Sequence, residues 1–216
     1  MKQITRATAL LAMLALASAG YAQTSVTDVP ARKGSSIHQG SVAEAFIAEN
    51  ITKSLVLLNN PALTEQQRGL QFEALLLSLT DMKRVALFTL GGYAQAGSSA
   101  ERDAFVAAFQ TYSVAVYRSY LSRFSGQTLT VTSSSERTQD DFIVSTSMVD
   151  HQGGQPLVVQ FRVRTDTGRP VVTDLGVMGV WLAISERDEF ASYLGSHGGS
   201  IPALTANVQE VAARYH

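Results

Sequence analysis

The apolar residues of this 216-residue chain change their spacing once, near residue 126, and that change restricts the possible folds. From about Ser41 to Arg123 they recur every three or four residues, as one face of a helix requires. From Gln127 to about Trp181 they alternate with polar residues, as in an antiparallel sheet that is covered on one side. Helices followed by a meander of strands predict the α+β class.

Capping signals divide the first half into four expected helices. Three pairs have the spacing of a capping box: Ser41 with Glu44, Thr64 with Gln67, and Ser98 with Glu101. The first helix should begin at Ser41 and end before Asn59-Asn60-Pro61, and the second should begin after Thr64. A third is expected over about 81–95, and a long one should run from Ser98 to about Arg123.

The second half predicts a sheet of about four strands. Along 157–164, Leu157, Val159, Phe161 and Val163 should share the inner face, while Gln160, Arg162 and Arg164 face outward. A turn at 165–168 leads to a return strand over 171–181, where Gly176 and Gly179 indicate bulges or a strong bend. A short helix should begin at Ser185, and the closing helix should span about 201–215. A curved sheet folded over the long helix gives a cone, whose apolar interior is either filled by side chains or hollow.

The N-terminus has the features of a secretory signal peptide over residues 1–22. Lys2 and Arg6 precede an uncharged run that is shorter than the roughly 20 apolar residues of a membrane span. Small residues then suit cleavage after Ala22, or alternatively after Ala19. We expect a flexible leader over 23–40 and a single domain over 41–216, exported to the periplasm.

Composition excludes several kinds of chemistry. The chain has no cysteine, so disulfides and thiolate sites are ruled out, and without a basic block nucleic acid is not an expected partner. His38, His151, His197 and His216 lack metal-ligand spacing, and we predict neither a metal nor a cofactor. Asp174 is the one fair candidate for a general base, but the pattern favours a solvated or salt-bridged strand carboxylate.

Two segments resemble the MlaC/Ttg2D family of periplasmic phospholipid-binding proteins, also known for toluene tolerance. The first match runs from Phe72 through Leu90-Gly91-Gly92-Tyr93 and Phe105 to Gly126. The second comprises Asp174, Gly179-Val180, Arg187, Phe190, Gly198-Gly199 and Leu204. Three positions depart from the family pattern: Ala94 and Pro170 replace large residues, and Trp181 replaces a small one.

The resemblance implies a nuclear-transport-factor-like cone with an apolar cavity that holds a diacyl phospholipid. It implies a non-enzymatic carrier that passes lipid between an outer-membrane lipoprotein complex and an inner-membrane ABC transporter complex with MCE domains. Three alternatives remain: a hopanoid carrier of the same family, a cavity enzyme that uses Asp174 as base, and a structural protein with a filled core.

The resemblance also implies that acyl chains insert between the sheet and the helices, with the headgroup at the mouth. The expected lining residues are the inward-facing apolar side chains of the third and fourth helices and of the last strands: Val85, Leu90, Tyr93, Phe109, Tyr112, Val116, Tyr117, Leu121, Val159, Phe161, Val163, Val177, Val180 and Trp181.

Overall fold

The computed structural model describes residues 37–121, 126–150 and 155–215. The expected signal peptide and its cleavage sites lie outside the described residues, as does the leader up to residue 36. The elements follow in the order α2 (Ile37–Leu58), α3 (Glu65–Leu79), α4 (Met82–Leu90), α5 (Tyr93–Ala96), α6 (Ser99–Leu121), β1 (Thr128–Thr138), β2 (Asp141–Val149), β3 (Leu157–Arg164), β4 (Val171–Val177), β5 (Val180–Trp181), α7 (Leu182–Ser196) and α8 (Ile201–Ala212).

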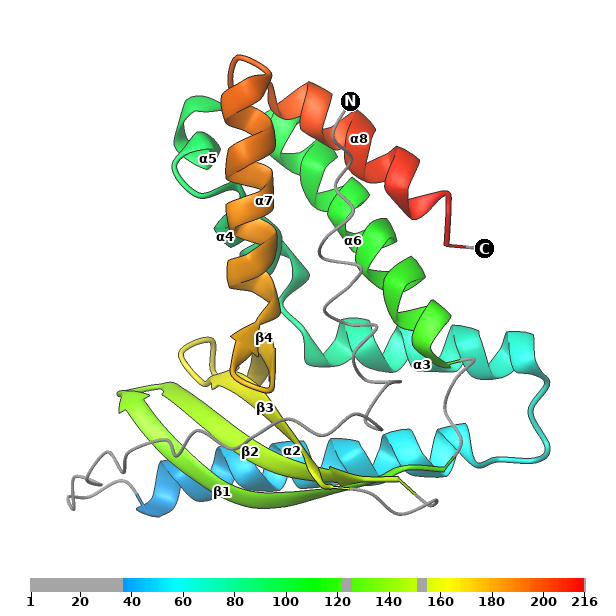
Figure 1. Ribbon diagram of the computed structural model, residues 1–216. Helices are drawn as coiled ribbons and strands as arrows, with labels where there is room; N and C mark the ends of the chain where they lie inside the picture. The colour runs from blue at the N-terminus through cyan, green and yellow to red at the C-terminus, as the bar shows by residue number, and fades with distance from the viewer. Residues whose placement is uncertain (1–36, 122–125, 151–154, 216) are drawn as a thin grey trace.

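The strands form one sheet in the order β1-β2-β3-β4-β5, with every neighbouring pair antiparallel (Figure 1). The α+β class and the antiparallel sheet are therefore confirmed, but the sheet has five strands instead of about four. The additional strand arises at Met178 and Gly179, whose φ angles of 51° and 82° make a two-residue turn. Val180 thereby returns beside Val177, so Gly179 marks a hairpin and not a bulge.

Two of the three expected capping boxes are confirmed. Thr64 and Gln67 bond reciprocally at the start of α3, and Ser98 and Glu101 do the same at α6. Ser41 is different, because α2 already begins at Ile37 and Ser41 lies within the helix. Glu44, its expected partner, instead accepts a hydrogen bond from Ser134 of β1 and so ties α2 to the sheet.

Two other helix boundaries differ from the prediction. The expected third helix is divided into α4 and α5, because Gly91 adopts a φ of 57° at the end of α4. The helix expected to begin at Ser185 begins three residues earlier, at Leu182.

The buried side chains form two clusters. In the first, α2 packs Ala43 and Ile47 onto Phe142, Val144 and Val163 of the sheet. The second joins α4, α6, α7 and α8, and at its centre the ring of Phe190 meets those of Phe105 and Phe109 edge-on, at 5.8 and 6.3 Å between ring centroids. Figure 1 shows α7 rising away from the sheet beside α4, with α6 and α8 running side by side. None of the described helices is long and apolar enough to cross a membrane.

Candidate functional site

The expected lining residues on the helices belong mainly to the second cluster. Leu90 and Tyr112 are only 1% and 8% exposed, and they pack there with Phe109 and Val116. Val85 and Tyr93 are half-buried against the same cluster. The structure thus brings these residues together in a closely packed helical core, while the side chain of Leu121 lies outside the described residues.

The expected lining residues on the strands are spread over three environments. Phe161 and Val163 pack against α2 in the first cluster. Val159 and Val177 pair across β3 and β4 and are buried, whereas Val180 is 37% exposed. Trp181 is half-buried with its ring over Gly176, where a Cβ atom would come within 3.1 Å of the ring. The strand residues therefore do not form one continuous wall with the residues on the helices.

Half-buried apolar side chains recur on α2, on α3 and on two strands of the sheet. Helix α3 contributes Phe72, Leu75 and Leu79 at helical spacing, and no residue of this helix is fully buried. The C-terminal half of α2 adds Ile51, Leu55 and Leu58, and the sheet adds Phe161 and its partner Leu175. We call these eight residues the half-buried stripe. Apart from Phe161, sequence reasoning did not assign them to the site, because their spacing marks an apolar face without showing what that face contacts.

Polar groups gather where α6 passes the start of α7. The hydroxyl of Tyr112 donates a hydrogen bond to Oε1 of Glu186 at 2.9 Å. The pKa of Glu186 is raised to about 7, chiefly by burial and also by the charge of the neighbouring Glu189, against the lowering effect of the Tyr112 hydrogen bond. Burial also raises the pKa of Tyr117 to about 12, with Asp174 and Glu186 adding to the effect. Near neutral pH Tyr117 is therefore uncharged, whereas Glu186 is about half protonated.

Asp174 caps a helix. Its Oδ1 accepts the backbone N–H groups of Leu175 and of Ala183 in the first turn of α7, both at 2.8 Å. Burial raises the pKa of Asp174, while these amide bonds and the charge of Arg162 act in the opposite direction. The carboxylate replaces the cap that Trp181 cannot provide, so the structure assigns Asp174 a structural role.

The family model for MlaC proteins matches residues 48–210 of the chain, a range that includes the described helices and strands after α2 except the last two residues of α8. The chain belongs to the MlaC family. A similar solved structure is that of the phospholipid-binding protein from Ralstonia solanacearum in complex with a phospholipid. The two are 19% identical with a TM-score of 0.70, and the match covers 80% of this chain and 98% of the other. Because the two sequences are only 19% identical, this similarity establishes a shared fold.

Departures from the MlaC pattern are absorbed locally. Ala94 is half-buried against the helical cluster, and Pro170 stands just before β4, where no strand amide is needed. Arg187 lies beside Glu186 and Asp188 on α7, and this acidic neighbourhood predicts a salt bridge. Instead, its guanidinium lies over the ring of Phe88 in α4, 5.2 Å from the centroid. It therefore contributes to the contact between these two helices.

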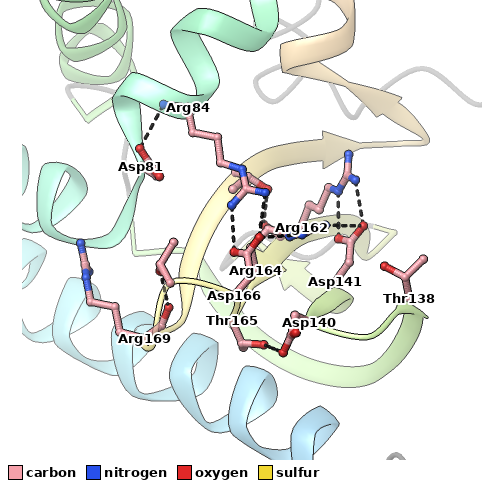
Figure 2. Close-up of polar contacts among 12 residues, drawn as sticks. Asp81, Arg84, Thr138, Asp140, Asp141, Arg162, Arg164, Thr165, Asp166 and Arg169 are labelled. Carbon is pink, nitrogen blue, oxygen red and sulfur yellow. Dashed lines mark hydrogen bonds and ion pairs between the residues drawn. The ribbon is translucent and has the colours of Figure 1, made fainter.

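An ionic network joins α4 to the hairpin between β3 and β4 in this MlaC-family chain (Figure 2). Arg84 holds both carboxylate oxygens of Asp166, at 2.9 and 3.0 Å, and Arg164 bonds the same carboxylate at 2.7 Å. Arg162 forms a second bidentate pair with the buried Asp141. The hydrogen bond from Arg84 contributes most to lowering the pKa of Asp166. Because these charges pair with one another, the network acts as a structural clamp.

The described part of this MlaC-family chain contains no group of three His, Asp or Glu residues placed to hold a metal ion. His197 stacks on Tyr193, with ring centroids 3.9 Å apart, at the end of α7. The side chain of His38 and the whole of His151 and His216 lie outside the described residues.

Proposed function

We propose that the protein is a periplasmic carrier of diacyl phospholipid that carries out no chemistry on its cargo. Its membership of the MlaC family supports a lipid-binding role, as does its likeness to a phospholipid-binding protein crystallised with a phospholipid. The apolar N-terminal run after two basic residues supports export.

The half-buried stripe carries this proposal. Protein interiors are packed as closely as organic crystals, so an apolar face of this size is normally buried completely. Here Phe72, Leu75 and Leu79 remain half-buried on α3, which lies against α2. We assign the stripe to acyl chains, and we add its α2 and α3 residues to the expected lining residues.

The energetics of lipid transfer explain why such a carrier needs an apolar chamber and no catalyst. Two acyl chains carry on the order of 30 methylenes, and each costs about 0.8 kcal/mol to expose to water. We propose that the carrier exchanges its lipid with an outer-membrane lipoprotein complex and with an inner-membrane MCE-domain ABC transporter complex. The hydrocarbon then stays shielded between the two membranes.

Mass spectrometry of the protein purified from a bacterial periplasm tests the proposal. Native spectra should show one added mass per chain, and organic extraction should identify it as a diacyl phospholipid. A polycyclic mass would instead identify a hopanoid carrier of the same family. If folded protein repeatedly yields no lipid and takes up no fluorescent phospholipid from vesicles, the carrier function is wrong.

A further inference from the structure

Glu186 has one carboxylate oxygen that is satisfied and one that is not. Its Oε1 accepts the hydroxyl of Tyr112, whereas Oε2 is fully buried and no donor among the described residues reaches it. Native structures contain few buried acceptors of this kind, because each costs about 1–3 kcal/mol when left unmet. The geometry therefore leaves one hydrogen bond at Oε2 to be made by something other than the described side chains.

The surroundings of Glu186 favour a cationic donor. The groups that face it are Tyr112 and Tyr117 on α6 and Glu189 on its own helix, and Asp174 also raises the pKa of Tyr117. Among the described residues, none of the groups that shift the pKa of Glu186 is a cation. A buried water molecule would satisfy the free oxygen, but it would not compensate the charge that about half of the Glu186 carboxyl groups carry at neutral pH. A positively charged N–H group would meet both requirements.

Glu186 borders the proposed lipid site through two of the expected lining residues on α6. Tyr112 donates its hydroxyl to Oε1 of Glu186, and Glu186 raises the pKa of Tyr117. Tyr112 also packs with Phe109 and Val116, which are further expected lining residues. A lipid held by these residues would therefore have the free Oε2 beside it.

We propose that Oε2 of Glu186 is the polar anchor of the lipid site and that it selects lipids whose headgroup carries an N–H donor, such as a primary ammonium. This inference rests on the proposed carrier function. Phosphatidylethanolamine and phosphatidylcholine with identical acyl chains distinguish a requirement for an N–H donor from a requirement for positive charge alone. Both headgroups carry a positive charge, but only ethanolamine has N–H bonds to donate.

The test offers delipidated protein to vesicles containing the two lipids in equal amounts, and the bound lipid is then quantified by mass spectrometry. The wild type should retain phosphatidylethanolamine over phosphatidylcholine by about tenfold, which corresponds to one charge-assisted hydrogen bond. Glu186→Gln keeps an oxygen for Tyr112 but loses the charge, so the ratio should fall close to one. Glu49→Gln alters an exposed α2 carboxylate paired with Lys53, and it should leave the ratio unchanged.

Two results would overturn the inference while leaving the carrier function intact: equal uptake of both lipids by the wild type, or the same preference in the wild type and in Glu186→Gln. Thermal unfolding of each variant establishes that it is folded. If the folded wild type takes up neither lipid, the proposed function itself fails.

Discussion

At the scale of single residues, Phe161 marks the place where the packed sheet core meets the half-buried stripe. It lies between Val144 and Leu175 on neighbouring strands and packs against the α2 cluster. Val158, three residues away, is on the opposite face and is 50% exposed. Arg162 is also on that face, but its pair with the buried Asp141 makes it unsuitable as a neutral control.

Phe161→Asp should abolish lipid retention and lower the free energy of unfolding, whereas Val158→Asp should do neither. A carboxylate at 161 would face hydrocarbon without a partner, at a cost of several kcal/mol unless it takes up a proton. Quantifying the phospholipid extracted from each purified variant checks this. Retention of lipid by a folded Phe161→Asp variant would remove this face of the sheet from the site.

Glu186 leads to a prediction about pH. Its pKa rises from the ordinary 4.5 to about 7 on folding, so the folded state holds a proton that the unfolded state has lost over this range. The stabilisation is complete below about pH 4.5 and is lost as the pH rises through about 7, with a total of at most about 3 kcal/mol. Urea unfolding at pH 5.5 and 8.5 should show this loss in the wild type and a smaller one in Glu186→Gln. Equal losses in both proteins would contradict the assignment.

At the scale of elements, α7 depends on β4 for its start. Asp174 on the strand accepts the Ala183 amide in the first turn of the helix, where the local N-cap residue makes no side-chain bond. Asp174→Ala should therefore lower the free energy of unfolding by about 1–3 kcal/mol. Asp174→Asn retains an oxygen for both amides and should lose less. Chemical denaturation measures both changes, with Asp103→Ala, at an exposed position on α6, as the control.

The elements show which features local sequence determines. The capping boxes at α3 and α6 are formed by residues three apart, so the sequence predicts them directly. The cap of α7 comes from Asp174, which is nine residues from Ala183 and on another element. Sequence reasoning placed the start at Ser185 because local signals could not show this distant acceptor. Similarly, Gly179 suggested an irregular strand, but only the register shows the hairpin that creates β5.

At the scale of the whole molecule, the apolar pattern predicted the α+β class and the antiparallel sheet but not the separation into two packed clusters. An apolar period shows that a face is covered, without showing what covers it. The stripe on α6 proved to be helical core around Phe105 and Phe109. The comparable stripe on α3 is half-buried throughout, although its leucines gave the same helical signal. Only the tertiary packing distinguishes the apolar face of α6 from that of α3.

Substitutions in the buried helical cluster and in the half-buried stripe should therefore differ in how bound lipid changes their effect on stability. Leu204 is fully buried in the helical cluster, so Leu204→Ala should cost about 2–5 kcal/mol whether or not lipid is bound. Leu75 on α3 belongs to the half-buried stripe, and we expect Leu75→Ala to cost less than about 1 kcal/mol in delipidated protein, because little packing is lost. Since ligand binding stabilises the folded state by mass action, Leu75→Ala should also reduce the extra stability that phospholipid confers. Urea unfolding of the two variants and the wild type, each with and without bound phospholipid, measures these four changes in the free energy of unfolding. Equal effects of Leu75→Ala in the two states would show that α3 faces protein and not lipid, and the stripe would then be ordinary, loosely packed core.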